Sequence, residues 1–402
     1  MKLEINRLTM LEAAKTAAKV APSGAFTDVI NGILVEGNSD TGVVYLTATN
    51  HSVSIRLKVF AAVHESGSML INARLLVDMM NKLDGDFITM SADKPQLLNV
   101  SGGRCRFQIN CIPSEHYPKP IMPFPEESVI MTGICSLAKR TVFAVSTDDS
   151  KPTLQCVQIK LKNNAVHAAA CDGAMRMMLT KDKSGIPGER EFLLPGRALQ
   201  LLASISQDDD VFEVSSIGNQ VVFVRGDMIF TINMLRTGEY MDTSKLIQDV
   251  NADYAAIADS GKLKEAFALL SIGAVAGGKN IPINLVMARG EITMTCNHEY
   301  SQAGTSISAK IITDTPDGGF YYDVTALLKL FNIVSGRVKI EIDAKGYMLV
   351  KTNTEVYLQM PVRPPAKTKK QDKKKGGSQS EQGDKNKEPK RAKGAEAVKE
   401  AA

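Results

Sequence analysis

A cysteine with a nearby base is the first chemistry that the sequence offers. Cys171 precedes Asp172, and His167 or His298 could act as its base. His167 and Cys171 belong to one predicted strand and point to the same face, but extended chain separates them by roughly 13 Å. A cysteine in an apolar strand usually serves packing. A stand-alone cysteine enzyme therefore remains an alternative, which an activity test of a Cys171→Ala variant would expose.

Motifs for phosphate, dinucleotide and zinc chemistry are missing from the sequence. It contains no Gly-x-x-x-x-Gly-Lys-Ser/Thr loop, no Gly-x-Gly-x-x-Gly after a strand and no His-Glu-x-x-His. The 5 histidines and 6 cysteines are scattered, without a Cys-x-x-Cys pair. We expect free thiols in a reducing cytosol, no metal and no cofactor.

Basic residues concentrate on the segments that we expect to be helical. Apolar residues at i, i+3 and i+4 predict helices within 8–21, 72–83, 133–146, 195–205, 260–274 and 324–334. Their bases are Lys15, Lys19, Arg74, Lys82, Lys139, Arg140, Arg197, Lys262, Lys264 and Lys329. The same segments hold only Glu12, Asp78 and Glu265 as acids, whereas the remaining body is acidic. A solvent-exposed face that happens to be basic could explain one such helix. All six together indicate a surface that binds a polyanion by contacts with its phosphates.

The first 364 residues repeat one pattern three times. Segments 44–50, 166–172 and 292–297 are similar strands, spaced by roughly 122–125 residues. Each copy contains a helix, strands, a second helix and more strands, and Asn72 and Asp323 stand where helix N-caps are expected. The strands connect mostly as hairpins. The pattern predicts an α+β fold with antiparallel sheets and three pseudo-equivalent domains, at 1–125, 126–250 and 251–364.

Residues 365–402 differ from the repeats in composition. They hold 12 Lys/Arg and 6 Asp/Glu, and almost no large apolar side chains. We expect a disordered basic tail, which either only keeps the chain soluble or holds DNA loosely. The chain has no apolar run long enough for a membrane span and begins without a signal-peptide pattern, so we expect a cytoplasmic protein. No Trp and only 5% aromatic residues argue against a groove that stacks single-stranded bases.

Several short motifs, in their order and spacing, resemble the bacterial DNA polymerase III beta subunit, the beta sliding clamp. They are Gly102-Gly-Arg-Cys-Arg-Phe107, Cys171-Asp-Gly173, Gly226-Asp-Met-Ile-Phe230, Gly238-Glu-Tyr-Met-Asp242 and Tyr357-Leu-Gln-Met-Pro-Val-Arg363. The resemblance covers residues 1–364. It implies the DNA clamp fold, in which a head-to-tail homodimer forms a ring with helices lining the hole and sheets outside.

The resemblance also implies a function. The chain would be a DNA polymerase processivity factor without catalysis of its own, which encircles duplex DNA regardless of sequence. It would tether the replicative polymerase and bind the clamp loader and other proteins that carry a clamp-binding motif. No cofactor is implied.

Three sets of site residues follow from the resemblance. The ten helix bases would face DNA, and Phe107 and Ile109 of one chain would pack near Ile272 of the other at the dimer interface. A partner peptide bearing a Gln and a Leu/Phe pair would bind an apolar cleft between the second and third domains. The cleft residues would be Leu154, Gly173, Arg176, Met241, Lys245, Leu246, Leu358, Met360, Pro361, Val362 and Arg363.

Departures from the family pattern lie around this cleft. Arg176 matches the family's His-Arg only with a one-residue insertion, Met241 stands where the family has proline, and Lys245-Leu246 replaces an Arg-Val pair. A shifted peptide preference leaves open a specialised clamp paralogue with a dedicated partner. A second, more typical clamp in the same genome would favour that alternative. The host, the loader and the cognate polymerase are not encoded in these motifs.

Overall fold

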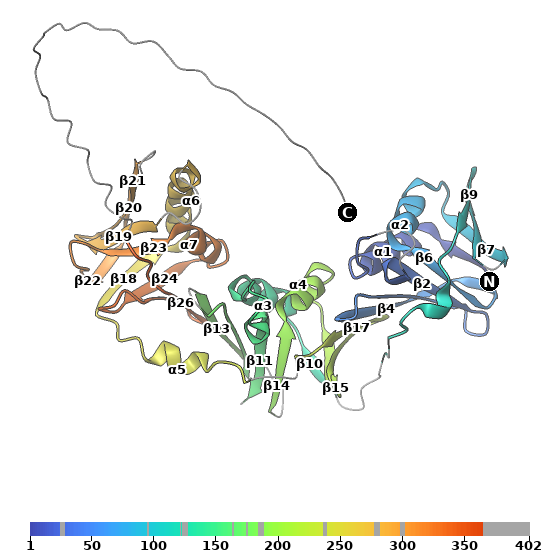
Figure 1. Cartoon of the computed structure of the whole chain (residues 1–402), viewed down its shortest axis with the longest axis horizontal. Coiled ribbons are helices and arrows are strands. Elements are labelled where there is room, and N and C mark those ends of the chain that lie inside the picture. The colour runs from blue at the N-terminus through green and yellow to red at the C-terminus, as the bar shows by residue number, and fades with distance from the viewer. Residues whose placement is uncertain are drawn as a thin grey trace, which may run out of the picture. The chain divides into compact units, whose positions relative to one another are not determined.

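One pattern of strands and helices recurs three times along the described chain (Figure 1). A computed structural model describes residues 1–24, 29–94, 96–120, 122, 128–162, 165–173, 176–183, 189–235, 239–276, 282–297 and 302–364. The predicted tail at 365–402 lies outside the described residues. No helix within the described ranges is both long and apolar enough to cross a membrane.

Each repeat contributes one pair of α-helices packed side by side (Figure 1). The pairs are α1 (Arg7–Ala18) with α2 (Ala73–Lys82), α3 (Ile134–Thr141) with α4 (Gly196–Ser204), and α6 (Ser260–Ala276) with α7 (Val324–Phe331). Short 3-10 turns are η1 (Val29–Asn31), η2 (Ser114–His116), η3 (Val142–Ala144) and η4 (Pro152–Gln155). The six predicted helices are confirmed to within a few residues at their ends.

Local sequence explains where these helices begin. The Asn72 side chain accepts a hydrogen bond from the Leu75 backbone N–H at 3.1 Å, and Asp323 accepts one from Thr325 at 2.8 Å. Both predicted N-caps are thus confirmed. Asn6, which was not predicted as a cap, does the same for α1.

α5 (Thr243–Gln248) is a short helix that the sequence did not predict. The Asp242 carboxylate caps it, accepting from the backbone N–H groups of Ser244 at 3.1 Å and Lys245 at 3.2 Å. Six residues are too few for a clear apolar period. The helix places Lys245 and Leu246, two predicted cleft residues, on the segment that leads into the third repeat.

The strands of the described chain form four antiparallel sheets. In spatial order, the five-stranded sheet is β5 (Ala62–Glu65), β1 (Lys2–Asn6), β7 (Phe87–Lys94), β8 (Leu97–Gly102) and β9 (Cys105–Asn110). The eight-stranded sheet is, in the same way, β10 (Val129–Met131), β15 (Phe212–Ile217), β16 (Gln220–Arg225), β17 (Met228–Asn233), β4 (Val53–Phe60), β3 (Val43–Thr49), β2 (Gly32–Asn38) and β6 (Gly67–Asn72). The nine-stranded sheet is β14 (Arg190–Pro195), β11 (Cys156–Lys162), β12 (Ala165–Cys171), β13 (Arg176–Lys183), β26 (Glu355–Gln359), β25 (Met348–Lys351), β24 (Arg337–Ile342), β18 (Tyr254–Asp259) and β22 (Lys310–Thr313). The four-stranded sheet is β21 (Gln302–Ser308), β20 (Glu291–Asn297), β19 (Pro282–Ala288) and β23 (Phe320–Asp323).

Two of these sheets continue from one repeat into the next. β17 of the second repeat pairs with β4 of the first, with Phe230 opposite Ile55. β13 of the second repeat pairs with β26 of the third, with Arg176 opposite Gln359. Backbone hydrogen bonds therefore join neighbouring repeats at both junctions. The five- and four-stranded sheets each stay within one repeat.

The core lies where the helix pairs cover the sheets. Phe267 of α6 and Phe331 of α7 are at most 1% exposed, and their ring centroids are 5.2 Å apart. Burying such a side chain stabilises the fold by about 1.5–3 kcal/mol. The apolar face of each helix is thereby fixed against its sheet, which leaves the polar face for solvent.

One carboxylate of the third repeat is buried between two cations. Glu341 is 6% exposed and lies 2.6 Å from the Lys339 ammonium and 2.5 Å from that of Lys351. Burial alone would raise the pKa of Glu341, but hydrogen bonds from the two lysines outweigh it and leave the pKa below its ordinary value.

Candidate functional site

The predicted DNA-facing bases are almost all exposed. Lys15, Lys19, Arg74, Lys82, Lys139, Arg197, Lys262, Lys264 and Lys329 lie on the solvent side of their helices. Arg74 pairs with Asp78 at 3.8 Å and Lys139 with Asp208 at 3.9 Å, both in solvent. Exposed pairs of this kind are weak, so a stronger anion can compete for the cations.

Arg140 differs from the other nine bases. Its side chain is 18% exposed, and its guanidinium donates to the Glu355 carboxylate at 2.8 Å. The charge is thus already neutralised within the chain. Lys19 is exposed, but its ammonium donates to the Ser204 carbonyl at the end of α4 at 2.6 Å, which links helices of two repeats.

Bases from different repeats meet in two grooves. Arg197 of α4 and Lys329 of α7 line a groove of about 680 Å³, together with Asn50 of the first repeat. Lys139 and Arg337 line a second groove, of about 890 Å³. Arg337 is exposed at the start of β24 and escaped prediction, because clustered charge was expected only on helical segments.

The predicted dimer residues lie on an edge strand and on an exposed helix face. Phe107 and Ile109 are half-buried on β9, which forms one edge of the five-stranded sheet. Ile272 of α6 is 71% exposed. Leu269, one helical turn earlier, is 50% exposed, and its i, i+3 spacing from Ile272 would have revealed it.

One part of the predicted cleft centres on Gly173. This residue has φ +79°, and a Cβ atom on it would come within 2.7 Å of the Leu154 side chain. The positive φ favours glycine here, and a larger residue would in addition displace the Leu154 methyl group. The Tyr240 hydroxyl donates to the Cys156 carbonyl at 3.4 Å, which brings the chain before Met241 to the start of β11, close to Leu154 in sequence.

A second part of the predicted cleft is a small apolar cluster between the second and third repeats. Leu358 of β26 is buried with Cys171 of β12 and Leu349 of β25. Leu246 of α5 packs against them, with Ile247 one residue further. The cluster joins elements of different repeats, and Cys171, Leu349 and Ile247 were not predicted as cleft residues.

The last predicted cleft residues are less closely joined to this cluster. Met360, Pro361 and Val362 are half-buried, and the Val362 backbone N–H donates to the Tyr321 carbonyl at 2.8 Å. Lys245, Met241 and Arg363 are exposed. The backbone of Arg176 pairs with Gln359, but its side chain is outside the described part.

The cysteine chemistry considered above has no support in the geometry. Cys171 is 5% exposed, and its sulfur accepts a hydrogen bond from the Gly173 N–H at 3.2 Å. Burial raises the pKa of the Cys171 thiol, which favours the unreactive protonated form. His298 lies outside the described residues. Among the described residues no cluster of His, Cys, Asp and Glu could hold a metal ion.

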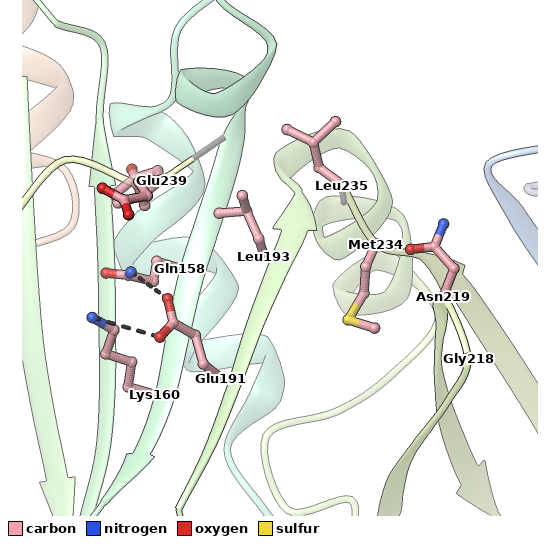
Figure 2. A pocket seen from close by; sticks show the side chains of 10 residues that line it. Gln158, Lys160, Glu191, Leu193, Gly218, Asn219, Met234, Leu235 and Glu239 are labelled. Carbon is pink, nitrogen blue, oxygen red and sulfur yellow. Dashed lines mark hydrogen bonds and ion pairs between the residues drawn. The ribbon is translucent and has the colours of Figure 1, made fainter. Parts of the chain in front are cut away.

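A further groove, of about 560 Å³, lies on the second repeat (Figure 2). Figure 2 shows the Glu191 carboxylate accepting from Gln158 at 2.7 Å and pairing with Lys160 at 3.7 Å. Leu193 points into the space beside them (Figure 2). Tyr240, which precedes the predicted cleft residue Met241 in the sequence, also lines this groove. Its two acids, Glu191 and Glu239, outnumber its one base, Lys160, so this groove does not extend the cationic surface.

Comparison with known proteins gives one consistent result. Residues 1–122 match the family model of the DNA polymerase III beta subunit, N-terminal domain, and residues 131–242 match that of its central domain. The beta sliding clamp of Bacillus subtilis is 26% identical over 388 residues, which cover 90% of this chain and 100% of that protein. The beta sliding clamp of Staphylococcus aureus (strain N315) is 22% identical over 79% of this chain and 85% of that protein.

Solved structures agree on the fold. The Bacillus subtilis sliding clamp has a TM-score of 0.83 at 21% identity and matches 91% of this chain and 100% of its own. The Pseudomonas aeruginosa DNA polymerase III subunit beta has a TM-score of 0.81 at 21% identity, over 90% and 100%.

Three antiparallel repeats with paired helices define the sliding-clamp class of protein. The chain belongs to the DNA polymerase III beta subunit family. It is accordingly a processivity factor, an accessory subunit of a DNA polymerase and not an enzyme, and the alternative of a cysteine enzyme is rejected.

Proposed function

We propose that two copies of this chain close head to tail into a ring around duplex DNA, with the nine exposed helix bases facing the phosphates. The observation that carries the proposal is the exposure of these bases on helices of all three repeats. We take the repeats 1–125, 126–250 and 251–364 as the clamp domains, so the closed ring has six.

The sheets supply a physical reason for ring closure. Both junctions inside the chain are built by a sheet that two repeats share, with eight and nine strands. The five-stranded sheet of the first repeat and the four-stranded sheet of the third repeat are the two sheets that no second repeat shares. Joining β9 of one protomer to β21 of its partner would make a nine-stranded sheet like the others and would cover both open edges. Phe107, Ile109 and Ile272 would then be buried at this interface.

Weak phosphate contacts are sufficient for such a ring. Dissociation requires the ring to open, so retention on DNA is topological and does not depend on tight binding. Exposed lysines and arginines attract phosphates without reading sequence, and salt screens them, so that the ring can slide. A tethered polymerase would stay near the primer end at a high effective concentration.

The partner site in this proposal is the cleft between the second and third domains. Leu246 and Leu358 lie in one apolar cluster, and the Leu154 side chain lies next to Gly173. Apolar anchors of this kind dominate the affinity of short peptides. The replicative polymerase, the clamp loader and other proteins with a clamp-binding motif would compete for it. A protein with this function would act in the cytoplasm, at the nucleoid.

A peptide titration tests the cleft. A fluorescent peptide of the Gln-Leu-x-Leu-Phe type should bind the dimer, and a Leu154→Ala/Met360→Ala double variant should lose at least about tenfold in affinity. An exposed leucine elsewhere, Leu8, gives the matched control Leu8→Ala, which should bind as the parent does. Equal affinity of the parent and the double variant would refute the cleft assignment.

A further inference from the structure

Arg140 and Glu355 form a partly buried ion pair between α3 of the second repeat and β26 of the third. The guanidinium donates to one carboxylate oxygen at 2.8 Å, and the two side chains are 18% and 9% exposed. The Tyr357 hydroxyl donates to the other carboxylate oxygen at 2.6 Å. The Arg140 Nε also donates to the Ser136 carbonyl at 3.2 Å, which holds the guanidinium against its own helix.

These contacts form one network that joins the second repeat to the third. Both oxygens of Glu355 have donors, and the Tyr357 ring lies 6.1 Å from that of Phe143 in η3. Burial raises the pKa of the Tyr357 hydroxyl, with Glu355 adding to the effect, so the group stays protonated as a donor. Removing one partner of such a pair leaves a buried charge unpaired, which is far more costly than losing a surface ion pair.

The network and the proposed cleft lie on opposite faces of one strand. Side chains alternate along β26, so Glu355 and Tyr357 point to the face covered by α3 and η3. Leu358 points the other way, into the apolar cluster with Leu246. Any shift of the strand relative to α3 would therefore move Leu358 on the cleft side.

We propose that Arg140 is a positioning residue for the partner cleft, acting through Glu355 and Tyr357 to fix β26. The proposal rests on the cleft assignment made above. It gives two neighbours on α3 different roles. Lys139 is 66% exposed and serves the phosphate surface, whereas Arg140 serves the cleft from the opposite side of the sheet.

Neighbouring substitutions test this division in the full-length dimer. Arg140→Gln should weaken binding of the fluorescent Gln-Leu-x-Leu-Phe-type peptide by about fivefold or more, while Lys139→Gln leaves it unchanged. Glu355→Gln should have a similar effect, and the double variant Arg140→Gln/Glu355→Gln should lose no more than either single variant, because the pair acts as a unit. Arg140→Lys keeps the charge and should restore part of the affinity.

Several outcomes would overturn the proposal. An Arg140→Gln variant with a lower Tm but unchanged peptide affinity would have a structural role only. If Arg140→Gln does not fold, Tyr357→Phe removes only one hydrogen bond to Glu355, and unchanged peptide affinity in that variant counts against the proposal in the same way. A parent protein that binds no such peptide would instead refute the cleft assignment itself, and the positioning role with it.

Discussion

Replacing Ile272 with Asn should separate the proposed dimer into folded monomers. In the single chain Ile272 is 71% exposed, and Leu269 beside it is 50% exposed. Complete burial of an isoleucine side chain contributes about 1.5–3 kcal/mol. Burying the exposed part of Ile272 against a partner would therefore contribute about 1–2 kcal/mol at each interface.

The asparagine amide adds to this loss. An amide buried without hydrogen-bond partners costs about 1–3 kcal/mol, so each interface would weaken by about 2–5 kcal/mol. A head-to-tail ring of two chains has two equivalent interfaces, and both must break for the chains to separate. At about 1.4 kcal/mol per factor of ten, the dissociation constant of the dimer should rise by about a thousandfold or more.

Light scattering during size-exclusion chromatography measures the effect over a dilution series. The parent should have twice the mass of the 43.5 kDa chain, and Ile272→Asn should have the mass of one chain with a native-like circular dichroism spectrum. Ile130 on β10 of the middle repeat is 56% exposed and gives the matched control Ile130→Asn, which should stay dimeric. A dimer of unchanged dissociation constant in Ile272→Asn, or equal dissociation in both variants, would contradict the interface.

Three further predictions concern charge. Neutralising three exposed helix lysines should make the affinity for duplex DNA less dependent on salt, with an unchanged Tm. The slope of log affinity against log salt concentration should fall in magnitude by about 0.9 for each phosphate that the protein no longer neutralises. An unaltered slope would exclude these residues from the DNA surface. The variant carries Lys15→Gln, Lys82→Gln and Lys264→Gln. Truncation after Pro364 should leave the dimer and its Tm unchanged and reduce salt-sensitive DNA affinity; unchanged DNA and peptide affinities would make the tail a solubiliser only. Glu341→Gln should lower Tm at neutral pH, because a carboxyl with a depressed pKa stabilises the fold fully at pH values above its ordinary pKa of 4.5. The difference in Tm from the parent should shrink as pH falls below 4.5 toward the lowered pKa, and a constant difference would contradict the role of Lys339 and Lys351.

The helices were predictable because their signals are local. Apolar spacing marked all six paired helices, and the caps at Asn72 and Asp323 need only neighbouring residues. α5 was missed because a helix of six residues shows less than two turns of any pattern. Leu269 was missed because the predicted interface residues followed from resemblance and not from exposure.

The contacts between repeats could not be predicted in the same way. Arg140 and Glu355 are 215 residues apart, and the sequence shows only an arginine on a basic helix face. Its assignment to the DNA surface followed from that local pattern, whereas burial and pairing are decided by the strand that packs against the helix. The shared sheets depend equally on long-range pairing, as at Phe230 and Ile55.

Retention on circular DNA tests the central claim most directly. The labelled protein, loaded on a nicked circular plasmid in moderate salt, should stay bound during gel filtration. It should be released when a restriction enzyme cuts the plasmid once, because a ring slides off a free end. Equal retention on the circle and on the linear product would contradict a topological clamp and indicate ordinary electrostatic binding.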